Sequence, residues 1–394
     1  MDEQPKKNGI ATVLWLGFSS LLNDLSSEMI LPILPQLITG AGGTGIALGL
    51  IGGLRDSAAE LLKVFFGRLS DKWASRKFFI YSGYATSAIF KLFLIFARTW
   101  YVIFGLVGLE RIGKAIRTSP RDALITQTLP NNIGKGFGIH RAFDNLGAIG
   151  GSVLAFYCVW HWNMGANTII VLAAMVSLVS LLPLTKVTET QAPVPPPNGI
   201  QKLRFADFIP PFKLFTLIAT LFSCSRISYM FFVVDAQQVL TTISPLQTAM
   251  LLYVLFNIFY TIFAIPFGIL SDKIGHWRMI VMGYALFALM LFGFRFARTI
   301  PQFIFCFILY GIALAIVQVA HKAYAAALAP AHMKATYLGM FESVTGLAIL
   351  TTGAVSGYAW DKFSHHGVFV VTGVLALVAC VLMVRYKKAL QLTL

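Results

Sequence analysis

The first stretch that could do chemistry is residues 108–123, GLERIGKAIRTSPRDA, which gathers ionisable side chains in a chain that is only 12% charged. Its spacing of Gly, four residues, Gly and Lys, ending at Lys114, is that of a phosphate-binding loop. Such a loop continues with Ser or Thr and follows a β-strand, whereas here Ala115 comes next and the apolar residues 100–112 run into the motif as one helix. The pattern therefore predicts a charged helix face and not a nucleotide site.

This helix face carries a row of charged side chains. At 3.6 residues per turn, the row consists of Glu110, Lys114, Arg117 and Arg121. Arg111 lies beside the row. An ionisable side chain among apolar helices costs several kcal/mol and faces the protein interior or a water-filled path, so it is a functional candidate.

A second group of candidate residues begins at Asn23. Asp24 and Glu28 are four residues apart, so their two carboxylates share one helix face. Like charges this close in a low dielectric favour proton binding by one of the two groups near neutral pH, as coupling to a proton gradient requires. A structural ion pair with an Arg or Lys of another helix is the alternative interpretation. Asn23, Asp24 and Ser27 could also bind a sodium ion.

Further ionisable residues interrupt other apolar stretches. Asp56, Glu60 and Lys63 fall on one helix stripe, where pairing within the stripe and contact with a substrate are equal alternatives. His321 is either a pH-dependent switch or an ordinary packed polar group, and we favour the second interpretation. The predicted substrate cavity comprises Asn23, Arg55, Asp56, Glu60, Glu110, Lys114, Arg141, Asp144, Arg226 and Glu342.

The elements that must position these residues are membrane-spanning helices. The chain has 394 residues, of which 57% are hydrophobic, against ~45–50% in a typical soluble domain. A bilayer core is ~30 Å thick and needs ~20 mostly apolar helical residues. The sequence therefore predicts an all-α polytopic membrane protein with twelve transmembrane helices, at residues 10–38, 46–67, 78–97, 100–118, 137–160, 166–184, 211–238, 247–268, 279–297, 301–328, 335–358 and 367–385.

Charge and proline placement predict the orientation and the domains. Lys and Arg concentrate in the loops on the side of the two termini, so both termini should be cytoplasmic. The net charge of +15 is spread between apolar stretches, which argues against a nucleic-acid partner. The Pro-rich stretch TETQAPVPPPNG interrupts the spans. We predict a six-helix bundle at 1–185, a cytoplasmic linker at 186–210 and a second six-helix bundle at 211–394.

The two halves of the chain share a repeat. GRLSDKWASRK at 67–77 returns as GILSDKIGHWR at 268–278, and FART at 96–99 returns at 296–299. Parallel repeats of this kind are typical of transporters in which two bundles surround a central path.

The repeated loop resembles the signature loop of the major facilitator superfamily of secondary transporters, and the resemblance extends over essentially the whole chain. The matching residues are Gly67, Asp71, Lys72, Arg76, Lys77, Asp272, Lys273 and Arg278. The resemblance implies that they form a cytoplasmic latch. In the first copy Ala74 replaces the usual Gly, which the second copy keeps as Gly275. Arg111 resembles the family's arginine in the fourth span, which implies a role in proton coupling together with Asp24 and Glu28.

The resemblance implies secondary transport by alternating access. The internal Arg and Lys residues favour a small polar, anionic substrate, and proton-driven efflux of lipophilic drugs is the alternative. NDLSSEM and RIGKAIRTSPRDALI resemble a prokaryotic branch of the family, which implies the cytoplasmic (inner) membrane. We predict no enzyme, because the chain contains neither His-Glu-x-x-His nor Gly-x-Ser-x-Gly. Beyond the bilayer and a small-molecule substrate we expect a monomer with no metal and no cofactor, driven by a proton gradient or, alternatively, by sodium.

Overall fold

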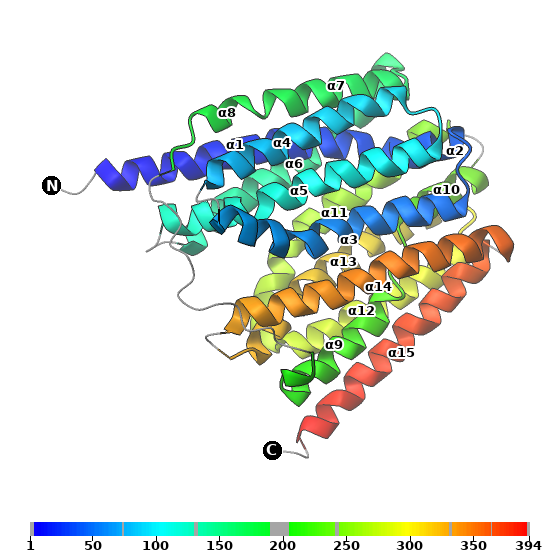
Figure 1. The fold of residues 1–394 in the computed structure, drawn as a ribbon. Coiled ribbons are helices and arrows are strands. Elements are labelled where there is room, and N and C mark those ends of the chain that lie inside the picture. The colour runs from blue at the N-terminus through cyan, green and yellow to red at the C-terminus, as the bar shows by residue number, and fades with distance from the viewer. Residues whose placement is uncertain are drawn as a thin grey trace. The chain divides into compact units, whose positions relative to one another are not determined.

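The structure is a computed structural model that describes residues 4–72, 75–129, 133–189, 205–240, 244–330, 333–363 and 365–391. Every regular element in these ranges is a helix (Figure 1). The contacts divide the chain into two units. Unit 1 contains the described residues of Met1–Gly42 and Ala58–Gly199, and unit 2 contains those of Gly43–Ser57 and Ile200–Leu394.

Unit 1 is built from long helices and a few short ones. Its elements are α1 (Gln4–Ile30), η1 (Leu31–Ile33), α2 (Leu34–Gly40), α4 (Arg76–Phe93), η2 (Leu94–Phe96), α5 (Trp100–Thr128), α6 (Ile133–Trp162), α7 (Ala166–Val179) and α8 (Leu182–Thr185). Within this unit α1 packs along α6, and α4 packs along α5. The close approach of α1 and α6 depends on Gly147 and Gly151, where an added Cβ would overlap the backbone carbonyls of Leu21 and Leu25.

Unit 2 is likewise built from long helices and a few short ones. Its elements are η4 (Phe205–Asp207), α9 (Pro210–Ser223), α10 (Tyr229–Val239), α11 (Pro245–Ile274), α12 (His276–Phe296), α13 (Ile300–Leu328), α14 (Lys334–Lys362) and α15 (His365–Gln391). The unit boundary lies inside α3 (Gly45–Lys72), whose first half belongs to unit 2.

Glycines let the first half of α3 touch α14 at the backbone. A Cβ added at Gly49 would overlap the carbonyl oxygen of Gly353, and one added at Gly353 would overlap that of Gly49. Asp361, near the end of α14, accepts hydrogen bonds at the start of α3 from Gly45 N (2.7 Å), Ile46 N (3.0 Å) and Thr44 Oγ1 (2.6 Å). The carboxylate therefore satisfies amide groups that a helix N-terminus leaves without partners.

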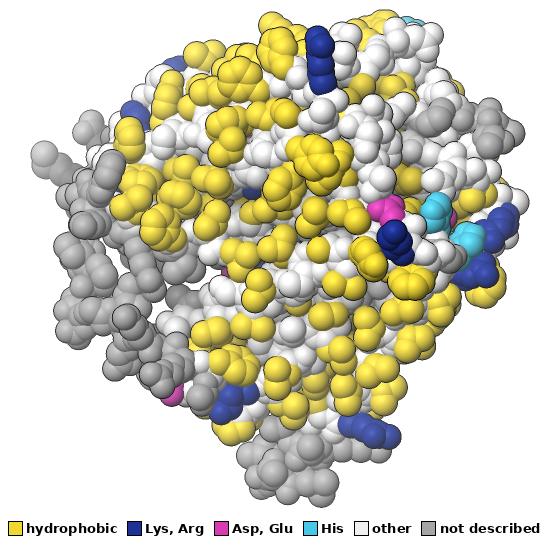
Figure 2. Space-filling model, turned by 45° about the vertical axis from the view of Figure 1, so that its right-hand side comes forward, with side chains coloured by type: hydrophobic (Ala, Val, Ile, Leu, Met, Phe, Trp, Pro, Cys, Tyr) yellow, Lys and Arg dark blue, Asp and Glu magenta, His cyan; other side chains and the backbone are white. Residues whose placement is uncertain are grey.

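Among the described residues, eight helices are long and apolar enough to cross a membrane. They are Arg76–Phe96, Lys135–Trp162, Ala166–Thr185, Leu246–Ile274, His276–Phe296, Ile300–Leu328, Thr336–Lys362 and His365–Tyr386. Each coincides with one of the twelve predicted spans. The other four predicted spans, at 10–38, 46–67, 100–118 and 211–238, contain ionisable or polar residues or a break. The total of twelve spans therefore stays a prediction, and so does the cytoplasmic location of the two termini. Large hydrophobic side chains such as Val355 and Phe305 are exposed, and hydrophobic groups cover much of the face shown in Figure 2.

Two predicted spans are wrong as single helices. The span at 10–38 ends as an α-helix at Ile30, because Pro32 and Pro35 start new helical turns in η1 and α2. The span at 211–238 is broken into α9 and α10 by the non-helical residues 224–228. Ser228 then caps α10 by accepting a hydrogen bond from Met230 N at 3.3 Å.

The sequence repeat has a structural counterpart. Thr99 precedes α5 and Thr299 precedes α13, and both have extended backbone angles. The second signature loop turns between α11 and α12 at Gly275, whose φ of +95° is rarely adopted by other residues. Position 74 of the first copy, where the sequence has Ala, lies outside the described residues.

Candidate functional site

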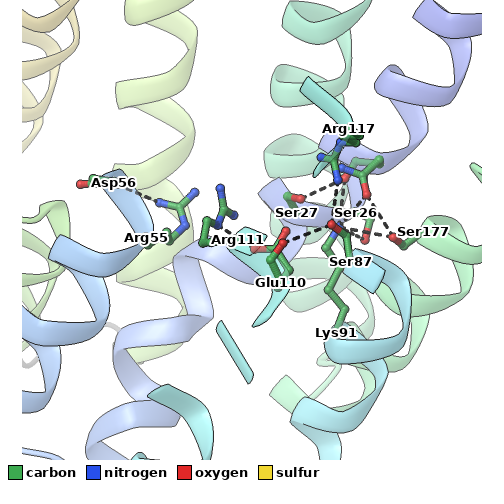
Figure 3. A network of polar contacts seen from close by, with 11 residues as sticks. Ser26, Ser27, Arg55, Asp56, Ser87, Lys91, Glu110, Arg111, Arg117 and Ser177 are labelled. Atoms are coloured by element: carbon green, nitrogen blue, oxygen red, sulfur yellow. Dashed lines mark hydrogen bonds and ion pairs between the residues drawn. The ribbon is translucent and has the colours of Figure 1, made fainter. Parts of the chain in front are cut away.

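A buried charged cluster lies among α1, α4, α5 and α7 of unit 1 (Figure 3). We define the cluster as Asn23, Ser26, Ser87, Lys91, Glu110, Arg111, Arg117 and Ser177, all of which are at most 6% exposed. Burying a charge is costly unless the charged group is paired and hydrogen-bonded, so the partners of each residue decide what the cluster does.

Lys91, on α4, is the most enclosed cation of the cluster, with 2% exposure. Its Nζ lies 3.2 Å from the backbone O and from the Oδ1 of Asn23. It also lies 3.2 Å from Ser26 Oγ and 3.4 Å from Ser177 Oγ. These acceptors belong to α1 and α7, so one ammonium group holds three helices together.

Glu110 and its neighbour Arg111 form a buried ion pair on α5. Arg111 Nε lies 2.6 Å from Glu110 Oε2, and the two side chains are 8% and 7% exposed. The second carboxylate oxygen, Oε1, has no hydrogen-bond partner among the described residues. Glu110 therefore keeps an acceptor unused inside the bundle, which is costly in a buried position unless another group or a ligand supplies the donor.

Arg117 joins the same cluster about two turns further along α5 than Glu110. Its Nη1 donates to Ser87 Oγ at 2.7 Å, and its guanidinium carbon lies 4.4 Å from the centre of the Tyr84 ring. At 3% exposure Arg117 is more deeply buried than Glu110, which is 6% exposed. The sequence predicts Arg117 only as a member of the charged row, and Arg117 is not among the residues of the predicted substrate cavity.

Lys114 and Asp24 differ from these residues because neither makes a side-chain hydrogen bond or ion pair with a described residue. Both are half-buried. The charges that act on Lys114 are those of Arg111, Asp24, Arg117 and Glu110. The charges of Lys114 and Asp24 thus act on each other. Neither side chain is bound to another described residue.

The other predicted residues of unit 1 have varied surroundings. Asp144, on α6, accepts from Ser20 Oγ at 2.6 Å and lies 3.3 Å from His140 Nδ1, so it is fixed between α1 and its own helix. Arg141 is exposed. Glu28, one turn after Asp24, and Glu60 are half-buried and engaged in further interactions.

The predicted substrate-cavity residues of unit 2 have separate surroundings and do not form one cluster among the contacts described below. Arg55 lies 3.6 Å from the exposed Asp56 and 5.8 Å from the centre of the Tyr229 ring. Glu342 pairs with Lys322 at 3.0 Å. Arg226 lies in the break between α9 and α10, and its guanidinium makes no hydrogen bond or ion pair in the described part of the chain.

His321 is a packed polar group in the structure. Its Nε2 lies 2.7 Å from the Tyr284 hydroxyl. The rings of Phe215, Phe222 and Phe341 contact it edge-on. This arrangement agrees with the favoured interpretation of the sequence.

Comparison with known proteins decides the family. Residues 16–247 and 215–391 match the sequence profile described as Major Facilitator Superfamily. The chain belongs to the Major Facilitator Superfamily. The resemblance found in the sequence is thereby confirmed, and this superfamily member is a multi-pass membrane transporter and not an enzyme.

Several relatives of this superfamily transporter are informative. An uncharacterised MFS-type transporter of Methanocaldococcus jannaschii is 42% identical over 97% of this chain and 95% of its own length. The multidrug resistance protein MdtH of Shigella dysenteriae is 21% identical over 88% of this chain and 85% of its own. Among solved structures, a mutant of the nucleoside transporter NupG superposes with a TM-score of 0.81 at 16% identity, covering 95% of this chain and 99% of that one. The POT family transporter PepTSo has a TM-score of 0.76 at 12% identity, covering 97% of this chain and 98% of that one.

The predicted latch residues of this superfamily transporter are partly described. In unit 1, Arg76 N donates to Glu189 Oε1 at 2.7 Å, and Arg76 Nη1 donates to Ala123 O at 3.2 Å. Lys77 Nζ donates to Thr185 O at 3.2 Å. Asp272, Lys273 and Arg278 are exposed in unit 2. The side chains of Asp71 and Lys72 lie outside the described residues, and Gly67 packs so closely on Ser119 of α5 that a Cβ would overlap its hydroxyl.

Sequence reasoning missed the residue at the centre of the transporter's buried charged cluster. Lys91 is a single cation in the apolar stretch 78–97, where the rule used for the other spans would have marked it as a candidate. The hydroxyl groups of Ser26, Ser87 and Ser177 gave no such signal, because serine is common in membrane helices and only their neighbours make them acceptors. No three His, Cys, Asp or Glu side chains cluster as a metal site in the part of the chain that the structure describes.

Proposed function

We propose that this chain is a proton-coupled secondary transporter that moves a small polar, anionic molecule by alternating access. The observation behind the proposal is the charge balance in and beside the buried charged cluster. The cations there are Lys91, Arg111, Lys114 and Arg117, and the carboxylates whose charges act on Lys91 and Lys114 are Glu110 and Asp24. Such an excess of positive charge among apolar helices attracts an anion and repels a cation.

Lys114 and Arg111 are the groups best suited to bind that anion. Lys114 Nζ has no hydrogen-bond partner among the described residues, and a carboxylate or phosphate would supply one. Arg111 offers a planar guanidinium next to it on the same helix. Because several cations gather in one unit, a polycarboxylate would neutralise more of them than a monovalent anion does.

Asp24 is the proposed main proton-coupling group, and Glu28 and Arg111 are proposed to take part in the same coupling. The Asp24 carboxylate makes no hydrogen bond or ion pair with a described residue, so its protonation would break no structural contact. Its charge acts on Lys91 and Lys114, so taking up a proton would change the field at the anion site. That link between proton binding and substrate binding is what coupled transport needs.

A liposome experiment tests the coupling. Purified protein is reconstituted, an inward or outward pH gradient is imposed, and the flux of a labelled polycarboxylate is measured. We expect Asp24→Asn to abolish gradient-driven flux while exchange of substrate without a gradient continues. Lys362→Gln, at an exposed lysine of α14, is the matched control. Undiminished gradient-driven flux in Asp24→Asn would show that coupling lies elsewhere.

A thermal-shift panel tests the substrate class. Ligands that bind only the folded protein raise its unfolding midpoint by mass action. We expect organic anions to raise the midpoint of the wild type and Lys114→Gln to lose most of that response, with Lys362→Gln responding like the wild type. Stabilisation by lipophilic cations alone would contradict an anionic substrate.

Proton-driven efflux of lipophilic compounds is the second candidate. It is favoured by the likeness to MdtH, which is named as a multidrug resistance protein. A groove of about 360 Å³ on unit 2, lined by Val355, Val371 and Leu375 among other residues of α14 and α15, would also accept an apolar molecule. The internal charges of unit 1 argue against it, since pockets for lipophilic ligands are mostly apolar. A resistance panel in an efflux-deficient host distinguishes the two functions.

The proposed setting follows from the same reasoning. The transporter would act as a monomer in the cytoplasmic (inner) membrane of a prokaryote, with the lipid bilayer and a small-molecule substrate as its partners. It would need no cofactor other than an ion gradient. A proton gradient is the proposed driving force, and a sodium gradient is the alternative.

A further inference from the structure

The environment of Lys91 contains no carboxylate at ion-pair distance among the described residues. Buried cations in proteins are normally paired with an anion. Glu110 is the carboxylate whose charge acts most strongly on Lys91, but its Oε2 is committed to Arg111. The Lys91 ammonium is instead surrounded by uncharged oxygens from α1 and α7.

The protons of the surrounding hydroxyl groups are used elsewhere. Ser26 Oγ donates to Ala173 O at 2.6 Å, and Ser177 Oγ donates to Asn23 Oδ1 at 3.2 Å. Both hydroxyls therefore present only lone pairs to Lys91. The backbone O and Oδ1 of Asn23 are acceptors by nature. The result is a set of four uncharged acceptors directed at one point, which is the kind of ligand set that hard monovalent cations take: carbonyl, amide and hydroxyl oxygens.

We propose that α1, α4 and α7 form a monovalent-cation site that the chain fills with its own ammonium group, Lys91, in place of a sodium ion. The inference rests on the proposed function, because it specifies the driving ion: transport does not require sodium. It also concerns the residue that the sequence offered as a sodium ligand, since Asn23 gives both of its oxygens to Lys91.

The size of the site identifies the cation that could replace Lys91. Acceptors at 3.2–3.4 Å from Nζ are at the long end of N–H···O distances. Lys91→Ala removes the ammonium and leaves a cavity where the buried side chain was. Methylammonium carries the same N–H donors as the lost group and fits that space. Choline has the same charge but no N–H donor and is too large.

The experiment measures the unfolding midpoint of purified Lys91→Ala at constant ionic strength while choline chloride is replaced by methylammonium or sodium chloride. We expect a lowered midpoint in choline and a saturable rise with methylammonium that the wild type and the exposed-lysine control Lys362→Ala do not show. A further Ser177→Ala substitution should weaken the response. Equal midpoints in all three salts would overturn the proposal.

Two measurements keep the proposal testable if Lys91→Ala does not fold. Lys91→Met keeps an unbranched side chain without donors, so it should fold less stably than the wild type and gain nothing from methylammonium. In wild-type liposomes, flux should be the same in sodium and in choline, and sodium-dependent flux would overturn the proposal. The thermal measurement needs no substrate, so a failure of the anionic-substrate proposal leaves a distinct signature: methylammonium rescue without transport of any anion.

Discussion

Removing the charge of Glu110 tests how the buried charged cluster is balanced. Glu110→Gln keeps the shape of the side chain and leaves Arg111, 2.6 Å away in the wild type, without its carboxylate. Both side chains are more than nine-tenths buried. Removing one partner of a buried ion pair costs about 3–5 kcal/mol. For a unit of this size, such a loss corresponds to about 6–20 °C in the unfolding midpoint.

A double-mutant cycle separates pairing from bulk effects. Arg111→Gln alone should also destabilise the protein. Glu110→Gln together with Arg111→Gln should be more stable than the sum of the single changes by ~1–3 kcal/mol, because the interaction between the two side chains is lost only once. The assay is the thermal midpoint in detergent, followed by tryptophan fluorescence. Asp272→Asn, at an exposed carboxylate of unit 2, is the control and should change the midpoint little.

The same variant links stability to the proposed substrate. Glu110→Gln increases the positive charge of the cluster, so an organic anion should stabilise it more than it stabilises the wild type. Strict additivity in the cycle, together with an unchanged response to anions, would refute the view that Glu110 is the structural counter-ion of an anion site.

Two further predictions concern the packing of unit 2. Gly353→Val should lower the free energy of unfolding by about 1–3 kcal/mol or more, because its Cβ would overlap the backbone of Gly49, which cannot move aside. Gly339→Val, with open space around it on the same helix, is the control for the unfolding midpoint, and equal effects would contradict the close contact. Asp361→Asn should cost ~1–2 kcal/mol because one amide oxygen replaces two carboxylate oxygens at the start of α3. Amide hydrogen exchange in the first turn of α3 should speed up in Asp361→Asn and not in Lys362→Ala, and unchanged exchange would contradict the proposed cap.

The sequence predicts the features of the fold that depend on one segment at a time. Hydropathy over ~20 residues identifies a membrane helix without any knowledge of its neighbours, and eight described helices coincide with predicted spans. The 3.6-residue period correctly places Glu110 and Arg117 toward the interior of unit 1. The family follows from the repeated loop, because its residue spacing is specific.

The features that depend on several segments were not predictable from the sequence. Glu189 closes the start of α4 by accepting hydrogen bonds from Arg76 N and Lys77 N, although more than a hundred residues separate them. The break after Ser223 has no proline or glycine to announce it. The partners of Lys91 come from α1 and α7, and no local pattern states which helices meet there.

The charged groups in and beside the buried charged cluster differ in whether the described residues supply them with partners. Lys91 and Arg117 have protein acceptors within 3.4 Å and aromatic or polar neighbours that fix their positions. Their charges therefore stay in place and set the field. Lys114 and Asp24 have no such partner among the described residues, so we propose that they exchange one partner for another during the transport cycle. In the proposed mechanism, the fixed positive field would let an anion at Lys114 and a proton at Asp24 change each other's affinity. Such a change is the free-energy coupling that a secondary transporter requires.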